Sequence, residues 1–271
     1  MKRISSIHNT LVRKIEQLQR KSRARKSEGL FIIEGQREVM LADRGGYEIE
    51  TLVICEELFD PSKQYTEEEI FNELKINQSP EIVFFTREVY EKVAYRGSTE
   101  GCLAFAKAKS HKLSSLKLSQ NPLILIAESP EKPGNIGAIL RTADAANVDA
   151  VIIVNPTTDL YNPNVIRSSV GCVLTVPTAV VESNELVDFL VDHEIDLYAA
   201  TLQNSNRYDL ADFTTSCAIA VGTEATGLSE ELRAAAKSNI VIPMAGSIDS
   251  MNVSVSAAIL LFEAKRQRNF Q

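Results

Sequence analysis

The sequence has few of the residues that build metal centres and disulfide frameworks. Its 271 residues include no tryptophan, four cysteines and three histidines. The cysteines stand far apart, without the paired spacing of metal or redox motifs, and no histidine clusters with them. These absences argue against a metal site and against a small secreted domain held by disulfides. We therefore expect a cytoplasmic protein that binds no metal.

Long apolar runs are absent as well. A helix that spans a bilayer needs about 20 predominantly apolar residues, and the chain offers no such run. Residues 1–27 are polar and basic, so they lack the apolar core of a signal peptide. The sequence thus predicts no association with a membrane.

Positive charge is concentrated at the start of the chain. Residues 1–27 carry nine lysines and arginines against Glu16 alone, a net of +8, so a chain whose formal charge is −7 carries −15 on its remainder. A basic segment on an acidic body is an electrostatic footprint for nucleic acid, although a solvated helix face has the same pattern. Apolar residues from Ile4 to Leu18 recur at helical spacing and predict a helix over 4–20.

Four segments follow one another along the chain. We expect a basic helical arm at 1–27, a small α/β domain at 28–107, a linker at 108–120 that is rich in serine and lysine, and a larger α/β domain at 121–271. In the larger domain continuous apolar strands alternate with helices, which is typical of a parallel sheet covered on both faces. Its predicted strands are 123–127, 151–154, 197–201, 218–221 and 240–242, and its helices are 136–147, 184–193, 229–237 and 253–268.

Three strand ends in the larger domain carry small or polar residues, and ligands of open α/β sheets bind at such ends. Taken singly, each residue has an ordinary explanation as a turn glycine, a solvated carboxylate, a helix cap or a surface cation. Their joint placement favours a binding site. The residues are Asn135 and Arg141 after the first strand, Gly222, Glu224 and Gly227 after the fourth, and Ser250 and Asn252 after the fifth.

Two common sites do not fit these residues. The turn from Gly134 to Gly137 is not G-x-G-x-x-G, and no acidic residue ends the next strand, so a dinucleotide-binding oxidoreductase is disfavoured. A nucleophilic triad is disfavoured because His193, the only histidine of the larger domain, lies on an ordinary predicted helix without a G-x-S-x-G elbow.

In order and spacing, the three segments resemble the motifs of the SpoU (TrmH) family of RNA ribose 2′-O-methyltransferases, within the SPOUT superfamily. The resemblance covers about 120–271, while residues 28–106 resemble the family's amino-terminal substrate-binding domain. Met251 stands where the family usually has Leu, Ala225 replaces a common Gly, and Ser256 a common Ala. The matching residues are Asn135, Gly137 and Arg141, then Gly222, Glu224, Gly227 and Leu228, then Ile242, Pro243, Met244, Ser250, Met251 and Asn252.

The resemblance implies a carboxyl-terminal trefoil knot that holds S-adenosylmethionine, and a homodimer with its active site at the interface. By this resemblance the cofactor lies near five residues: Thr201, Gly222, Ile242, Met244 and Met251.

The same resemblance assigns the chemistry. Arg141 would be the base that deprotonates a ribose 2′-hydroxyl or, because an arginine is normally locked in its charged form, the group that orients it. Asn135 would hold Arg141. Ser250 and Asn252 would shape the ribose and phosphate site, Glu224 would support them, and Arg167 would contact an RNA phosphate.

The expected function is S-adenosylmethionine-dependent 2′-O-methylation of RNA. The extra amino-terminal domain favours ribosomal RNA as the substrate. A transfer-RNA ribose methyltransferase stays open, as does a catalytically idle RNA-binding protein on the same fold, although the presence of Asn135, Arg141, Ser250 and Asn252 argues against idleness.

Overall fold

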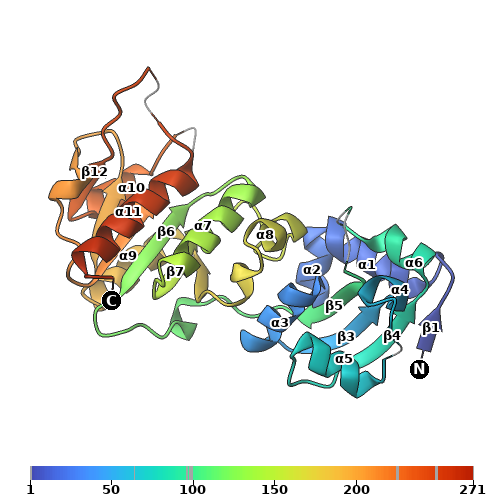
Figure 1. Cartoon of the computed structure of the whole chain (residues 1–271). Helices are drawn as coiled ribbons and strands as arrows, with labels where there is room; N and C mark the ends of the chain where they lie inside the picture. Colours follow the sequence, from blue (N-terminus) through green and yellow to red (C-terminus); the bar gives the residue numbers. More distant parts are fainter. Residues whose placement is uncertain are drawn as a thin grey trace. The chain divides into compact units, whose positions relative to one another are not determined.

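The computed structural model describes residues 2–63, 65–95, 97, 100–223, 226–247 and 250–270. They form two compact units (Figure 1). The first unit is Met1–Lys109 together with Asp159–Thr175, and the second is Ser110–Thr158 together with Val176–Gln271.

The first unit is built on a five-stranded mixed sheet in the order β1-β4-β3-β5-β2. Strand β5 is antiparallel to β3 and β2, and the β1–β4 and β3–β4 pairs are parallel. The strands are β1 (Lys2–Ile4), β2 (Leu30–Glu34), β3 (Ile49–Ile54), β4 (Glu81–Phe85) and β5 (Cys102–Lys107). The helices are α1 (Thr10–Arg20), α2 (Ser22–Glu28), α3 (Gln36–Arg44), α4 (Glu56–Phe59), α5 (Glu67–Leu74) and α6 (Arg87–Val93).

Residues 1–27 are an integral part of this unit rather than an arm. The predicted helix over 4–20 begins only at Thr10, because the Asn9 side chain accepts a hydrogen bond from Leu11 N and caps it. Ile4 instead lies in β1, which pairs with β4. Val12, Ile15 and Leu18 of α1 are fully buried, so removal of residues 1–27 would open the core of the unit.

Residues 159–175 also depart from the expected boundaries. The sequence assigns them to the larger domain, whereas in the structure they pack with the first unit. They contain α8 (Pro163–Ser168) and the short 3₁₀ helix η2 (Cys172–Leu174), neither of which was predicted. The chain therefore leaves the second unit after β7 and returns to it before β8.

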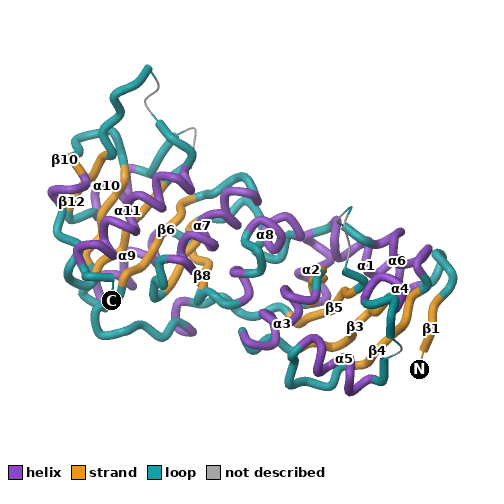
Figure 2. The backbone as a smooth tube through the Cα atoms, viewed as in Figure 1, coloured by secondary structure: helices purple, strands orange, loops and turns teal. Residues whose placement is uncertain are grey.

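The second unit is a seven-stranded, all-parallel sheet in the order β10-β12-β9-β11-β6-β7-β8. Figure 2 draws the strands of the chain in orange. The parallel sheet predicted from the apolar runs is confirmed. Two of its strands, β8 and β10, were not predicted. The strands are β6 (Leu123–Glu128), β7 (Ala150–Val154), β8 (Thr178–Val181), β9 (Asp196–Ala200), β10 (Asn206–Arg207), β11 (Cys217–Val221) and β12 (Ser238–Val241).

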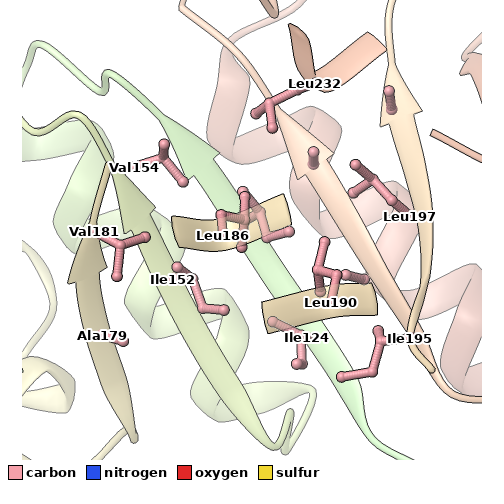
Figure 3. Close-up of a cluster of buried hydrophobic side chains, with 14 of the residues drawn as sticks. Ile124, Ile152, Val154, Ala179, Val181, Leu186, Leu190, Ile195, Leu197 and Leu232 are labelled. Carbon is pink, nitrogen blue, oxygen red and sulfur yellow. The ribbon is translucent and has the colours of Figure 1, made fainter. Parts of the chain in front are cut away.

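Helices cover both faces of this sheet. Helices α7 (Pro133–Ala145) and α11 (Val253–Gln267) pack side by side on one face (Figure 1). Helices α9 (Ser183–Asp192) and α10 (Glu230–Ala235) lie on the other face, where their buried leucines join one cluster with the strands. There Leu186 and Leu190 of α9 meet Ile124 and Ile152 of the strands in a buried cluster (Figure 3).

The expected linker is largely bound to the second unit. Its 3₁₀ helix η1 (Leu113–Ser115) and the residues that follow pack Leu113, Leu116 and Leu118 against the cluster of Figure 3. Val180 N of β8 donates a hydrogen bond to His111 O. A further short 3₁₀ helix, η3 (Tyr208–Leu210), follows β10.

Within the described residues, no helix has the length and apolarity needed to cross a membrane.

Candidate active site

A cavity of about 400 Å³ opens at the carboxyl ends of β9, β11 and β12 in the second unit. This volume is typical of sites that hold a small molecule. No charged side chain from the described part of the chain lines it. All five residues predicted to bind the cofactor lie on its wall, together with Ser250: Thr201, Gly222, Ile242, Met244, Ser250 and Met251.

The wall after β11 is a tight turn. A Cβ atom on Gly222 would lie 2.2 Å from the carbonyl carbon of Gly227, so this position has no room for a side chain. Thr223 N donates to Gly227 O and Gly227 N donates to Thr223 O, each at 3.1 Å. Gly227 has φ +70°, a conformation that favours glycine. Since neither glycine has a side chain, the cavity wall is bare backbone at both positions.

Asn252 joins the first and third motifs. As the cap of α11, its Oδ1 accepts hydrogen bonds from Ser254 N at 2.9 Å and Ser254 Oγ at 2.6 Å. Its Nδ2 donates to Asn135 Oδ1, in the first turn of α7, at 3.1 Å. Asn135 also lines a small cavity that shares Gly222, Thr223 and Val253 with the larger one. The side-chain amide of Asn252 thus both caps α11 and links the first motif to the third.

Arg141 is exposed on α7, and its side chain makes no hydrogen bond or ion pair with the described residues. It is not among the residues that line the cavity. Asn135 was expected to hold Arg141, but it bonds Asn252 instead. The reason is helix geometry: six residues rise about 9 Å and turn the side chain about 240° around the axis, so the two face different directions.

Two predicted residues fall elsewhere. Glu224 lies outside the described residues. Arg167 belongs to the first unit, on α8, while the other described site residues belong to the second. The structure thus gathers Asn135, Ser250 and Asn252 at the strand ends and leaves Arg141 on an open helix face.

Two residues of the site were missed from the sequence. Glu128, the last residue of β6, is 5% exposed, and its Oε2 accepts a hydrogen bond from Ser229 N at 2.7 Å. Since Ser229 caps α10, this carboxylate ties the end of the first motif's strand to the end of the second motif. Gln203 lines the cavity and accepts a hydrogen bond from Thr201 Oγ1. In the sequence, Glu128 could have been found as a carboxylate at the end of an apolar strand, whereas no sequence pattern pointed to Gln203.

This arrangement can bind and orient but has few reactive groups of its own. The cavity offers hydroxyls, an amide and backbone, and no group of three or more metal-ligating side chains occurs among the described residues. Such a site suits chemistry in which the bound molecule carries the reactive group. A cation such as Arg141 would then act from outside the cavity.

Two family models match the chain. Residues 122–262 match the model of the SpoU rRNA Methylase family, and residues 9–104 match that of the MRM3-like substrate binding domain. The chain is 26% identical over 265 residues to the 23S rRNA (guanosine(2553)-2′-O)-methyltransferase RlmP of Bacillus subtilis (strain 168), covering 98% of this chain and 100% of that protein.

Solved structures agree over the whole length. A crystal structure of an RNA 2′-O ribose methyltransferase is 36% identical, with a TM-score of 0.82, and the match covers 98% of this chain and 99% of the other. An AdoMet-bound rRNA methyltransferase from Sinorhizobium meliloti is 25% identical, with a TM-score of 0.87, covering 98% of this chain and 97% of the other.

Proposed function

Because this chain belongs to the SpoU rRNA Methylase family, we propose that it transfers a methyl group from S-adenosylmethionine to a ribose 2′-hydroxyl of ribosomal RNA. Relatives that span its full length carry out 2′-O-methylation of RNA, and one was crystallised with the cofactor. The observation that carries the proposal is the convergence of the second and third motifs on one cavity, with Asn135 of the first motif beside it.

The cavity fits S-adenosylmethionine. Its volume of about 400 Å³ suits a nucleoside with an amino-acid tail, and the bare backbone at Gly222 and Gly227 lets a ligand approach closely. Thr201, Gly222, Ile242, Met244 and Met251 would hold the cofactor, which supplies a methyl group on a positively charged sulfur. Among the described residues, the cavity wall has no charged side chain that would compete for that charge.

The chain's own part is to present the ribose. The 2′-oxygen must lie in line with the carbon–sulfur bond and lose its proton as the new carbon–oxygen bond forms. Arg141 orients this hydroxyl or accepts its proton, and the paired Asn135 and Asn252, with Ser250, shape the ribose and phosphate site. Glu224, two residues after Gly222 in the sequence, is assigned by the motif to support them.

We further infer that the working form is a homodimer. Val255 and Phe262, seven residues apart on α11, are 47% and 42% exposed, so this helix keeps an apolar face uncovered. Helix α7, which carries the open Arg141, packs beside α11. A second copy over α7 and α11 would cover the apolar face and give Arg141 a site to act in.

Two finer points belong to the same proposal. A trefoil knot is supported by the path of the chain, which goes from β12, second from one edge of the sheet, back to α11, packed on α7 and β11. A cytoplasmic location is supported by four cysteines that form no disulfide, three of them buried.

The test is Arg141→Ala, with Arg44→Ala as control, because Arg44 is also an exposed helical arginine that forms no ion pair with a described residue. Single-turnover methyl transfer to ribosomal RNA and calorimetric binding of S-adenosylmethionine are measured for both. We expect Arg141→Ala to bind the cofactor normally and to transfer methyl about a hundredfold more slowly, the scale of losing one acid–base group.

Other outcomes decide against parts of the proposal. Transfer by Arg141→Ala at the parent's rate would remove Arg141 from the mechanism. Cofactor binding without transfer by the parent would favour the idle RNA-binding protein. Preference for transfer RNA over ribosomal RNA would favour the transfer-RNA enzyme.

A further inference from the structure

The loop that begins the first motif is held by hydroxyl groups of a neighbouring loop. Residues 129–132, which we call the motif loop, connect β6 to α7. Thr157 and Thr158 lie in the loop that follows β7. Thr157 Oγ1 donates a hydrogen bond to Pro130 O at 3.2 Å, and Thr158 Oγ1 donates one to Glu131 O at 3.4 Å. The hydrogen bond of Thr158 is the longer and therefore the weaker of the two.

Both loops are fixed to the sheet at their first residues. Ser129 N donates to Val154 O at 2.7 Å, and Asn155 N donates to Val181 O at 2.9 Å. Asn155 Nδ2 also donates to Ser183 Oγ at 2.8 Å. Ser129 and Asn155 have φ +47° and +48°, in the left-handed region where residues with a side chain are uncommon. The two threonine hydroxyls therefore join the loops beyond starting points that are already fixed.

The motif loop sets where α7 begins. Lys132, its last residue, accepts hydrogen bonds at its carbonyl oxygen from Asn135 N at 2.9 Å and from Ile136 N at 3.2 Å. The side chain of Asn135 accepts the hydrogen bond of Asn252 that joins the first and third motifs. Because these bonds follow one another along the chain, a shift of the motif loop would displace the pair of amides.

The motif loop borders one part of the site and not the other. Residues 130–132 line the small cavity that also contains Asn135. None of them lines the larger cavity of about 400 Å³, which is the proposed cofactor site. A shift of the motif loop should therefore disturb the ribose site and leave the cofactor wall in place.

We propose that Thr157 and Thr158 are positioning residues for methyl transfer, because their hydroxyls hold the motif loop where Asn135 meets Asn252. The inference rests on the proposed function and adds to it two residues that lie outside the three motifs. Neither threonine lines either cavity. Their effect should therefore appear in the rate of transfer and not in the affinity for the cofactor.

The test replaces both threonines by valine, which keeps the branched shape and removes the hydroxyl. Single-turnover methyl transfer to ribosomal RNA, KM for the RNA and calorimetric binding of S-adenosylmethionine are measured. We expect transfer to be about tenfold slower, less than the hundredfold cost of a 1 Å misplacement because Ser129 still fixes the loop. KM and cofactor affinity should be unchanged. Replacing both threonines by serine, which keeps the hydroxyl, should restore the rate.

Thr214→Val is the matched control. Thr214 is an exposed threonine of the second unit whose hydroxyl also donates a hydrogen bond, to Asp212, and it lines neither cavity. Hydrogen exchange of the Asn135 and Ile136 amides, which donate to Lys132 O, follows the motif loop without any methyl transfer. Exchange at these amides should be faster in the double valine variant, and unchanged in the serine variant and in Thr214→Val.

Three results would overturn the inference. They are transfer by the double valine variant as fast as by Thr214→Val, a serine variant as slow as the valine variant, and a loss of rate that is matched by a loss of cofactor affinity. Failure of the proposed function gives a different result, because the parent itself would then transfer no methyl group to ribosomal RNA. Hydrogen exchange would still show whether the hydroxyls hold the motif loop, and unchanged exchange in the valine variant would overturn that as well.

Discussion

Gly222→Ala probes the cavity with a single methyl group. The added Cβ would lie 2.2 Å from the carbonyl carbon, 2.3 Å from the oxygen of Gly227, and 2.4 Å from Leu228 N. Carbon contacts are favourable near 3.5–4.0 Å, so the turn would have to move by roughly 1 Å or more. Because all three atoms are backbone, no side-chain rotation relieves the clash. Overpacking of this kind costs about 1–3 kcal/mol.

The movement would displace the wall against which the cofactor is proposed to lie. Calorimetry should show weaker binding of S-adenosylmethionine, and methyl transfer should fall about a hundredfold, the scale of a 1 Å misplacement. The Tm should fall by several degrees, at roughly 2–4 °C per kcal/mol. Gly134→Ala is the control, because a Cβ there meets nothing within 4 Å. If Gly222→Ala bound cofactor as well as Gly134→Ala, the cavity would not be the cofactor site.

The remaining predictions concern stability and assembly. Asp159→Asn should lower the free energy of unfolding of the first unit by about 3–5 kcal/mol, because it strands the buried Arg25. Burial raises the pKa of Asp159, but the hydrogen bonds and charge of Arg25 lower it below its ordinary value. Urea unfolding should therefore show the whole difference in free energy of unfolding between the parent and Asp159→Asn above about pH 4. This difference should shrink as the pH falls through the lowered pKa of Asp159, and a difference that stays constant with pH would contradict this reasoning. Arg268→Ala should lower the Tm, because Nε of Arg268 donates to Phe213 O at 2.7 Å and its other nitrogens donate to further carbonyl oxygens. An unchanged melting curve would show that these hydrogen bonds do not stabilise the second unit. Phe262→Glu should shift light scattering to the monomer mass, and an unchanged mass would exclude α11 from the interface.

The fold of the second unit could be predicted because its strands are continuous apolar runs, which a parallel sheet buried on both faces requires. Some of the unpredicted elements, such as α5 and β10, have weak apolar patterns. Helix α5 is acidic, yet Thr66 and Glu69 form a capping box that was readable as a helix start. The predicted helix wrongly included Ile4 of β1 because Ile4 and Ile7 continue the helical spacing of α1. Only Asn9, which caps α1, marked where the helix begins.

The motifs pointed to the residues of the site but not to their contacts. The bond between Asn135 and Asn252 joins residues 117 positions apart, and one sequence holds no signal for such a pair. The link expected between Asn135 and Arg141 failed for a local reason that the helical repeat could have revealed. Sequence therefore identified the polar groups, while the geometry of α7 and α11 decided which of them meet.

The segment 159–175 shows why sequence boundaries mislead about function. It lies within residues 122–262, which match the methylase family, and it connects two neighbouring strands of the second unit. Yet Val165 and Ile166 are buried in the first unit, and Arg167 lines a small hollow of that unit together with Gln19 and Tyr95. A substitution that loosens this packing should lower the stability of the first unit while the affinity for the cofactor stays unchanged.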